Sequence, residues 1–322
     1  MTGEGGLLRF VLKRLAVAIP LLLLISFIVF SLVKLAPGDP VRALLGAKPA
    51  TEATLDAIRD RYNLNDPYLL QYGKWIWGVL HGDLGRSIQG DRRISGIIAS
   101  RMELTLFLAT MSAAVILVGG IGLGALAAFR RNSWIDRALV MFGVIGISAP
   151  AYVFGIFLLY FFGVVLQWFP VFGDGEGFFD RFWHLVLPAL ALSFSVMAII
   201  IKITRASMIE EMDKDYVTFA RARGLSAGRI STNYILRNAL VPVITAAGLI
   251  LVGLVAGSIY VEVTFSLSGF GSLTFEAVAG RNLPLIQATA LIFSVIVVAA
   301  NLIIDIIYTL IDPRIRFGAA PK

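Results

Sequence analysis

The chain contains no cysteine and only two histidines, His81 and His184. The absence of cysteine excludes disulfides, thiolate metal sites and cysteine nucleophiles. The two histidines lie far apart in the sequence and lack the spacing of metal ligands. The nucleotide-binding pattern G-x-x-x-x-G-K-[ST] is missing too, because Gly73-Lys74-Trp75 has neither the upstream glycine nor the hydroxyl. We therefore expect this chain to bind no metal, no cofactor and no nucleotide through a P-loop.

Charged residues are also scarce. They make up 15% of the 322 residues, compared with about 25% in soluble domains, and hydrophobic residues make up 58%. The mean hydropathy of +0.83 indicates a polytopic membrane protein. Six stretches without Asp, Glu, Lys or Arg are long enough to cross a bilayer core of about 30 Å, and the first is expected to be a retained anchor because no small-residue cleavage site follows it. The predicted spans are Leu15–Val33, Leu104–Phe129, Ala138–Gly173 (its membrane part ending near Leu166), Phe182–Ile201, Ala239–Val261 and Leu283–Ile304.

The distribution of positive charge predicts how the spans are oriented. Sixteen of the 28 Lys and Arg lie in segments on the N-terminal side of the membrane, whereas the two short loops on the other side hold one each, Arg181 and Arg281. The remaining ten lie between Lys34 and Arg101, in a segment long enough to be translocated regardless of its charge. The positive-inside rule therefore predicts cytoplasmic N- and C-termini. This asymmetry explains the net charge of +7 without a nucleic-acid partner.

A polar segment between the fourth and fifth predicted spans, residues 202–237, carries eleven charged residues. A connection between two spans needs only a turn, so its length calls for a reason. Its residues Met208, Met212, Tyr216 and Phe219 recur at helical spacing, which predicts one packed helical face.

The same segment contains the signals of a helix end and of a second helix. Gly224 suits a left-handed helix stop, with Leu225 packing back on the preceding turn. Ser226 can cap a second helix that begins at Ala227. We expect these elements to form a rigid knob on the membrane surface that docks on a partner protein. The predicted organisation is residues 1–35 with the first span, an extracytoplasmic segment over 36–101, a five-helix core over 102–316 with a cytoplasmic loop at 202–238, and a tail over 317–322.

The extracytoplasmic segment contains two amphipathic patterns. Thr51–Tyr62 is predicted to be one short helix, and Pro67 suits the first turn of another that carries an apolar stripe. Two interpretations stay open: a lid packed on the membrane helices at the lipid interface, or a surface that meets an extracytoplasmic partner. The stripe consists of Tyr68, Tyr72, Trp75, Ile76 and Val79.

Small residues and prolines inside the spans predict close packing and bending. Pro150 and Pro188 should kink the spans that contain them. Glycines crowd the second span and form a small-xxx-small pair in the fifth, which lets helices approach each other. These glycines are Gly119, Gly120, Gly122, Gly124, Gly253 and Gly257.

Asp305 is the clearest ionisable residue inside a predicted span, and Asn301 lies one turn before it on the same helical face. A charge at the centre of a membrane helix costs about 3 kcal/mol on insertion scales, so Asp305 needs a partner, water or a proton. Its nearness to the cytoplasmic end favours a structural tether over a proton relay. Glu262 ends the fifth span and could contact a basic residue or a substrate. Neither position forms the chain of carboxylates that is typical of a proton-driven pump.

Short motifs occur in a characteristic order along the whole chain. From the N- to the C-terminus they are Pro37-Gly38-Asp39-Pro40, Gln71-Tyr72, Gly82-Asp83-Leu84-Gly85, Asp215-Tyr216-Val217, Ala220-Arg221-Ala222-Arg223-Gly224-Leu225, Arg237-Asn238-Ala239-Leu240-Val241-Pro242 and Asp312-Pro313-Arg314-Ile315-Arg316. In this order they resemble the integral-membrane permease subunits of ATP-binding-cassette importers of the dipeptide, oligopeptide and nickel class. The cytoplasmic loop is similar to the importer signature E-A-A-x-x-x-G, although only Ala220 and Gly224 keep the strict form and the proline falls late, at Pro242.

The resemblance implies an all-α, six-helix type I importer permease. Its non-catalytic chain would carry a coupling helix that sits in a groove on one of two cytoplasmic ATP-binding subunits or domains, which hold the ATP and Mg²⁺. A second permease subunit (a homologous partner or a second copy), an extracytoplasmic binding protein and the lipid bilayer of a bacterial or archaeal cell membrane complete the assembly. The implied cargo is a di- or oligopeptide, with nickel, haem, glutathione or an oligosaccharide as alternatives. The implied coupling residues are Asp215, Tyr216, Phe219, Ala220, Arg221, Ala222, Arg223, Gly224 and Leu225; the outer-loop or gate residues are Glu262, Phe265, Gly269, Phe270 and Gly271; and Asn301 and Asp305 are the intramembrane polar residues.

Two other classes of function remain as alternatives. A self-sufficient secondary transporter usually shows inverted repeats and spans broken at matching positions, and the sequence shows no internal repeat. An intramembrane hydrolase could use His184 with Ser193 or Ser195, but these residues lie on one short stretch without a G-x-S-x-G context. Serine in a membrane helix usually hydrogen-bonds and packs.

Overall fold

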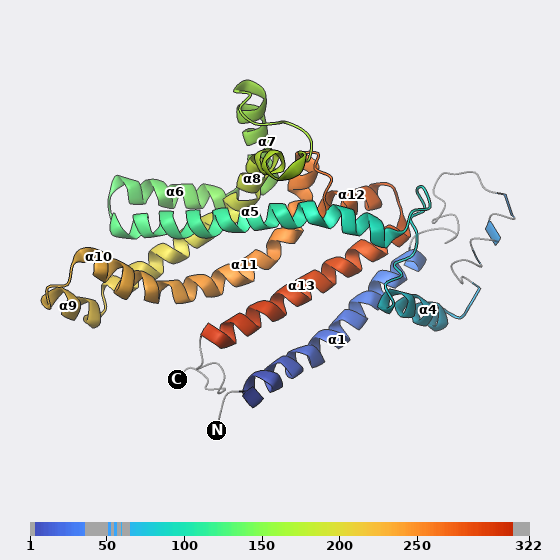
Figure 1. Cartoon of the computed structure of the whole chain (residues 1–322), viewed down its shortest axis with the longest axis horizontal. Helices are drawn as coiled ribbons and strands as arrows, with labels where there is room; N and C mark the ends of the chain where they lie inside the picture. The colour runs from blue at the N-terminus through green and yellow to red at the C-terminus, as the bar shows by residue number, and fades with distance from the viewer. Residues whose placement is uncertain (1–3, 36–50, 53–54, 57–58, 60–64, 312–322) are drawn as a thin grey trace. The chain divides into compact units, whose positions relative to one another are not determined.

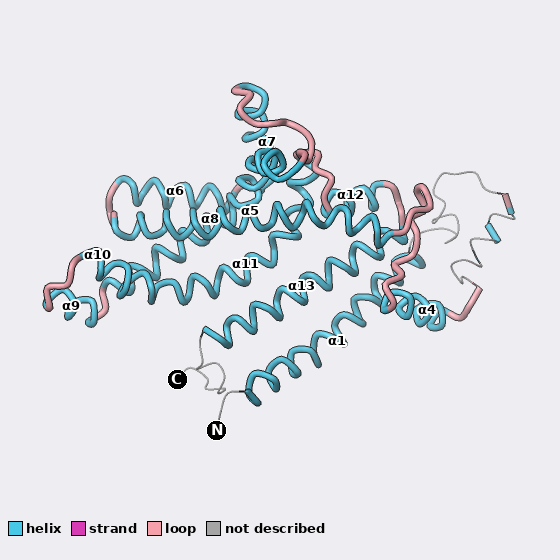
Figure 2. The backbone as a smooth tube through the Cα atoms, viewed as in Figure 1, coloured by secondary structure: helices cyan, strands magenta, loops and turns pink. Residues whose placement is uncertain are grey.

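The structure is a computed structural model that describes residues 4–35, 51–52, 55–56, 59 and 65–311. In these residues it contains helices and connecting loops, with no named strand and a single antiparallel bridge between Arg86 and Arg93 (Figure 2). Most of the predicted helix Thr51–Tyr62 and all residues after Ile311 lie outside the described part. The helices labelled in Figure 1, together with the short π-helices η1 and η2, are α1 (Glu4–Leu35), α4 (Tyr68–Leu80), α5 (Ile94–Phe129), α6 (Trp134–Ser148), α7 (Ala151–Leu158), η1 (Leu159–Val165), α8 (Gly177–Met212), α9 (Asp215–Ala222), α10 (Ala227–Arg229), η2 (Ile230–Leu236), α11 (Arg237–Thr264), α12 (Phe270–Ala279) and α13 (Leu283–Ile311).

The apolar helices correspond to the six predicted spans. Among the described residues, α1, α5, α8 and α13 are each long and apolar enough to cross a membrane, and two bent helix pairs raise the number to as many as six. One pair is α6 with α7 and η1, and the other runs from α10 through α11 with a bend of 60° between Gly248 and Gly253. The predicted all-helical, multi-span architecture is therefore confirmed.

The third predicted span is not one continuous helix, because α6 and α7 meet at an angle of 110°. Pro150 precedes α7, and proline both lacks an N–H and disfavours helical geometry in the residue before it. Ala149 is accordingly extended, with φ −95° and ψ 126°. The Ser195 hydroxyl of α8 donates to the Ala149 carbonyl at 3.0 Å, which satisfies an acceptor at the break. Pro188, by contrast, lies inside the uninterrupted α8.

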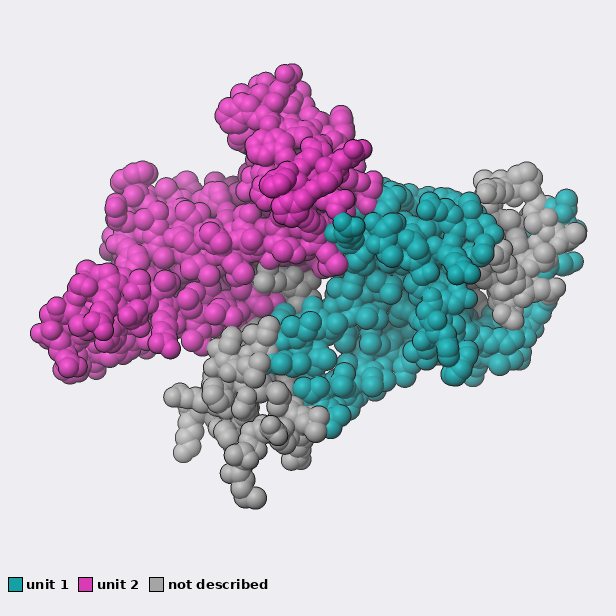
Figure 3. Space-filling model, in the orientation of Figure 1, with its two compact units in different colours: residues 1–103, 269–306, 316–322 teal, residues 104–268, 307–315 magenta. Residues whose placement is uncertain are grey.

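The chain forms two compact units, coloured separately in Figure 3. Unit 1 comprises residues 1–103, 269–306 and 316–322, and unit 2 comprises residues 104–268 and 307–315. In unit 1, α1 and α13 run antiparallel and side by side (Figure 1). A buried cluster at the start of α5 and along α12 and α13 forms a core in this unit. It consists of Ile94, Ile98, Phe270, Leu273, Ala277, Leu285 and Ala288.

α4 packs against one end of α1 within unit 1. The Tyr72 hydroxyl shares a hydrogen bond of 2.7 Å with the Ser26 hydroxyl, and aromatic rings of the two helices lie between 5.2 and 5.8 Å apart. These contacts favour the first interpretation of the stripe, a helix packed on a membrane span. The rings are Phe27 and Phe30 of α1 and Tyr68, Tyr72 and Trp75 of α4.

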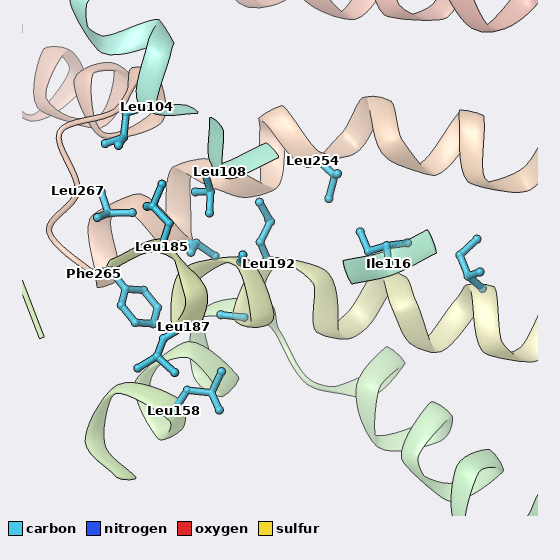
Figure 4. Packing of buried hydrophobic residues seen from close by; sticks show 14 of the residues in the cluster. Leu104, Leu108, Ile116, Leu158, Leu185, Leu187, Leu192, Leu254, Phe265 and Leu267 are labelled. Carbon is cyan, nitrogen blue, oxygen red and sulfur yellow. The ribbon is translucent and has the colours of Figure 1, made fainter. Parts of the chain in front are cut away.

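α8 is the central helix of unit 2, in contact with α6, α7 and α11. Glycines of α5 that face α8 explain how closely these two helices approach each other. A Cβ added to Gly120 of α5 would lie 2.6 Å from the Ile200 side chain, and one added to Gly124 would lie 2.6 Å from that of Thr204. The core around α8 is seen in Figure 4, which labels Leu104, Leu108, Ile116, Leu158, Leu185, Leu187, Leu192, Leu254, Phe265 and Leu267.

The predicted glycine packing is confirmed at some positions only. A Cβ on Gly119 would meet the Met197 sulfur at 2.7 Å, and one on Gly257 would meet Leu192 at 3.2 Å. A Cβ on Gly122 or Gly253 would meet no atom of the described residues within 4 Å, so no close helix packing is seen at these two glycines within that part of the chain.

Candidate functional site

The polar loop between α8 and α11 starts with a break that the sequence pattern did not reveal. α8 ends at Met212, and the non-helical residues Asp213 and Lys214 separate it from α9. Met208, Met212 and Tyr216 all pack against one hydrophobic cluster, so the prediction of one packed face from Met208 to Phe219 fails only at Phe219. Met208 is buried, but Phe219 is 69% exposed because the turn changes the direction in which α9 presents its side chains.

α9 instead buries Val217 and Ala220. They belong to a small hydrophobic core that draws on the end of α5, the end of α8, η2 and the start of α11. The loop therefore folds into a knob around a hydrophobic core and is not an extended connection. The buried members are Ala128, Met208, Val217, Ala220, Ile230, Ile235 and Ala239.

A polar network centred on Tyr216 ties the same elements together. The Tyr216 hydroxyl donates to the Glu211 carboxylate of α8, and the Asn238 amide of α11 donates to that hydroxyl at 3.1 Å and to the Tyr234 carbonyl at 2.8 Å. Burial, with a smaller effect from the hydrogen bond to Glu211, raises the pKa of Tyr216 above its usual value. Tyr216 therefore stays neutral and joins α8, α9 and α11.

The end of α9 has the geometry predicted for Gly224. Its φ is +73°, in the left-handed region. The Gly224 N–H donates to the Arg221 carbonyl at 3.0 Å, and the Leu225 N–H donates to the Ala220 carbonyl at 3.3 Å. These two bonds define a Schellman motif, and the half-buried Leu225 packs against the loop core as this motif usually requires.

The second predicted helix also begins where expected. Ser226 occupies the N-cap position of α10, which continues through η2 into α11. Its hydroxyl makes no capping bond, so the predicted position is confirmed and the predicted capping contact is not.

The outer surface of the knob carries most of the predicted coupling residues. Ala220 is buried, and Tyr216 and Leu225 are half-buried. Burial of the exposed Phe219 by a partner would contribute about 1.5–3 kcal/mol. The six exposed residues are Asp215, Phe219, Arg221, Ala222, Arg223 and Gly224.

Ion pairs fix the base of the knob. The Lys214 ammonium lies 2.9 Å from the Glu210 carboxylate, and this hydrogen bond raises the pKa of Lys214. The Arg131 guanidinium, in the connection between α5 and α6, lies 3.6 Å from the Asp213 carboxylate. This connection and the knob therefore lie at the same end of unit 2.

The predicted outer-loop residues are all buried. Glu262 is fully buried in unit 2, where the Thr105 hydroxyl donates to its carboxylate at 2.7 Å. Phe265, also in unit 2, lies against α7, so that a Cβ on Gly155 would approach its ring to 3.1 Å. The remaining three, Gly269, Phe270 and Gly271, belong to unit 1, where Phe270 is part of the core.

The two predicted intramembrane polar residues, Asp305 and Asn301, have different partners. Asp305 of α13 forms an ion pair with Arg14 of α1 at 3.1 Å, which supplies the partner that the sequence analysis required. Asn301 is exposed, and its amide donates to the Val297 carbonyl of its own helix at 2.9 Å.

A partly buried ion pair in unit 2 was missed by the sequence reasoning. Arg205 of α8 donates to both carboxylate oxygens of Asp136 at 2.5 and 2.8 Å, and the Asp136 side chain is only 4% exposed. Two signals could have revealed it: Ser133 and Asp136 have the spacing of a capping box, and an arginine near the end of a span needs a partner.

The side chains of the hydrolase alternative act as helix packers. The Ser193 and Ser195 hydroxyls donate to the Leu190 and Ala149 carbonyls at 3.0 Å each, while the His184 ring bonds with the Asp180 carbonyl at 2.9 Å. In the part of the chain that the structure describes, no three His, Asp or Glu side chains lie close enough together to hold a metal ion.

Comparison with known proteins agrees with these features. Residues 120–317 match the family described as binding-protein-dependent transport system inner membrane component, and residues 7–109 match the N-terminal region of such membrane components. A putative peptide transport system permease protein of Brucella abortus (strain 2308) is 38% identical over 311 residues, which cover 95% of this chain and 98% of the relative. The glutathione transport system permease protein of Shigella flexneri serotype 5b (strain 8401) is 37% identical over 311 residues, which cover 97% of this chain and 100% of the relative.

Solved structures show the same fold. An amino acid ABC transporter has a chain that superposes with a TM-score of 0.51 at 17% identity, covering 67% of this chain and 94% of that one. A methionine ABC transporter in inward-facing conformations gives a TM-score of 0.50 at 17% identity, covering 65% and 95%. The protein is a multi-pass protein of the cell membrane that belongs to the inner membrane components of binding-protein-dependent transport systems, the permease subunits of ABC importers.

Proposed function

We propose that this chain forms half of the translocation path of an importer for di- or oligopeptides and that a second permease subunit forms the other half. The chain itself catalyses no reaction. Two cytoplasmic ATPase subunits or domains bind ATP and Mg²⁺, and an extracytoplasmic binding protein delivers the cargo.

The observation that carries this proposal is the knob between α8 and α11. Its exposed Phe219 is held on a helix whose other side is fixed by a core and whose end is fixed by the Schellman motif at Gly224. A rigid apolar side chain among charged groups suits insertion into a groove on a partner. We assign that groove to the ATPase, and the knob is then the coupling helix.

The core beneath the knob explains how it could transmit motion. Val217 of α9 shares that core with Met208 of α8 and Ala239 of α11. A displacement of α9 by the closing ATPases therefore moves the ends of two membrane helices together, since packed cores transmit strain and do not absorb it. This is a rigid-body route from nucleotide binding to the opening of the membrane path.

The proposed orientation places the knob, the connection after α5 and both termini in the cytoplasm. It is supported by the excess of Lys and Arg in these segments and by the ion pair between Arg131 and Asp213. The buried residues Glu262, Phe265 and Phe270 then lie toward the outer side, where we assign them, with Gly269 and Gly271, to the gate region as packing residues.

The proposed cargo is supported by the names of two relatives, a peptide permease and a glutathione permease. Glutathione is itself a tripeptide, so both names describe peptide-like molecules. Nickel, haem and oligosaccharide remain as alternative cargoes of the same class.

Reconstitution tests this function. The purified chain alone in proteoliposomes should neither transport peptide nor hydrolyse ATP, whereas the assembly with its second permease, ATPases and binding protein should do both. Transport by the chain alone, driven by an ion gradient, would show that it is a secondary transporter.

A further inference from the structure

A groove of about 510 Å³ opens on the surface of unit 2 beside α6. One part of its lining is polar or charged and the other is apolar. The polar part includes the Asp136–Arg205 ion pair, which the transport mechanism proposed above does not use. The lining residues are Asn132, Asp136, Arg137, Val140, Met141, Val144 and Arg205.

The floor of the groove holds Arg205 in a fixed orientation. The Nε–H of Arg205 and one N–H of its Nη2 donate to the Asp136 carboxylate. The same carboxylate also accepts a hydrogen bond from the Asn132 N–H at 2.9 Å. A guanidinium has five N–H donors, so these two bonds leave three for another acceptor. The Arg205 side chain is 28% exposed, which gives such an acceptor access to it.

The rim of the groove adds a second cation. Arg137 is exposed, and among the residues that the structure describes no carboxylate forms an ion pair with it. The residues three, four and seven positions later, Val140, Met141 and Val144, follow on the same helical face. They are 45%, 66% and 61% exposed, so a continuous apolar stripe begins next to the cation.

The composition of α6 and the residues before it favours a membrane surface near residues 130–137. Residues 130–137 contain three arginines and the exposed Trp134, while residues 138–173 contain no charged side chain. Basic and tryptophan side chains favour the headgroup region, and uncharged helix favours the hydrocarbon. With a rise of 1.5 Å per residue, Val144 lies about 10 Å further along α6 than Arg137.

We propose that this groove is a binding site for an anionic phospholipid. The phosphate accepts hydrogen bonds from Arg137 and from the free donors of Arg205, while one acyl chain lies along Val140, Met141 and Val144. A soluble phosphate would use the cations only, whereas a lipid uses the cations and the stripe. The assignment to the inner leaflet rests on the orientation in the proposed function; the site itself needs only a membrane surface at residues 130–137.

Native mass spectrometry of the intact importer assembly tests this site. The assembly is exchanged into mild detergent and titrated with dioleoyl phosphatidylglycerol or, separately, dioleoyl phosphatidylcholine. The wild type should bind the anionic lipid more tightly, and Arg137→Gln should lose about fivefold in that affinity, since one arginine near an anionic lipid contributes about 1 kcal/mol. Arg92→Gln, the same change at an exposed arginine of unit 1, is the matched control and should not alter it.

Three outcomes would overturn the proposal. Equal affinity for the two lipids would mean that only general lipid contacts cover this face. Unchanged binding in Arg137→Gln would place the lipid elsewhere or show that another subunit covers the groove. Displacement of the lipid by millimolar inorganic phosphate would show that the groove binds phosphate alone and that the apolar stripe holds no acyl chain. The same spectra also give the mass of each assembly and so show whether the ATPase subunits are present. A missing lipid site can therefore be distinguished from a wrong assignment of the ATPase partner.

Discussion

Replacement of Gly224 should test whether the backbone geometry at the end of α9 is needed for the coupling of transport to ATP hydrolysis. Gly224 has φ +73°, and a Cβ added there meets no described atom within 4 Å. A Cβ therefore causes no clash within this chain, and within the chain the substitution acts through the backbone. Left-handed geometry costs an ordinary residue about 1–2 kcal/mol, less for asparagine and more for a β-branched residue.

This cost acts on the Schellman motif that ends α9. A penalty of 1–2 kcal/mol changes the ratio of intact to frayed helix ends by about 5- to 30-fold. We expect the amount of peptide transported per ATP hydrolysed to fall in the order Gly224→Asn, Gly224→Ala, Gly224→Val. In the last variant transport should be uncoupled from hydrolysis while membrane insertion stays normal.

The assay is peptide uptake and phosphate release measured together in proteoliposomes that contain the whole assembly. Gly228→Ala is the matched control, because Gly228 also has open space at its Cβ position but lies in α10 without a positive φ. Normal coupling in Gly224→Val, or an equal loss in Gly228→Ala, would refute the reasoning.

Three further predictions concern the ion pairs and Tyr216. Asp136→Ala should lower the unfolding free energy by about 1.5–3 kcal/mol, because it removes the two charged hydrogen bonds that Asp136 accepts from the partly exposed Arg205; a melting temperature in detergent equal to that of the wild type would contradict this. The raised pKa of Tyr216 means that its contribution to loop stability is present below pH 10 and declines as the pH rises through the pKa of the folded state. An ultraviolet difference titration of wild type against Tyr216→Phe should therefore show a midpoint of ionisation above pH 10, and a midpoint at or below pH 10 would contradict this. Arg14→Gln should reduce thermal stability more in the wild-type background than in Asp305→Asn, with a coupling energy of about 1 kcal/mol, and purely additive effects would speak against the tether.

The parts of the fold that follow from local rules could be predicted from the sequence. Uncharged apolar runs determine where a chain can cross a bilayer, and five of the six predicted runs lie in helices without a sharp break at a proline. The left-handed stop at Gly224 was predictable for the same reason, since glycine is favoured at that geometry. Pro150 was flagged as a kink, but its 110° bend depends on α8, whose Ser195 bonds the carbonyl before the proline.

The features that depend on distant residues could not be predicted in the same way. Arg14 and Asp305 are 291 positions apart, so the sequence indicates only that Asp305 needs a partner. Phe219 was mispredicted as a packed residue because a two-residue turn at Asp213 and Lys214 resets the helical periodicity, which is reliable only within one helix. Burial of Glu262 likewise requires the position of Thr105, a residue of another helix.

Cross-linking in the intact assembly tests the proposed coupling role most directly. The chain has no cysteine, so Phe219→Cys introduces the only thiol in it, at an exposed position on the knob. With a short bifunctional maleimide, this thiol should link to an introduced cysteine in the surface groove of an ATPase subunit, and the yield should depend on nucleotide. Phe179→Cys, at a residue that is 86% exposed in the first turn of α8, should give no such product. Cross-linking from position 179 to the ATPase, or none from position 219, would contradict the account.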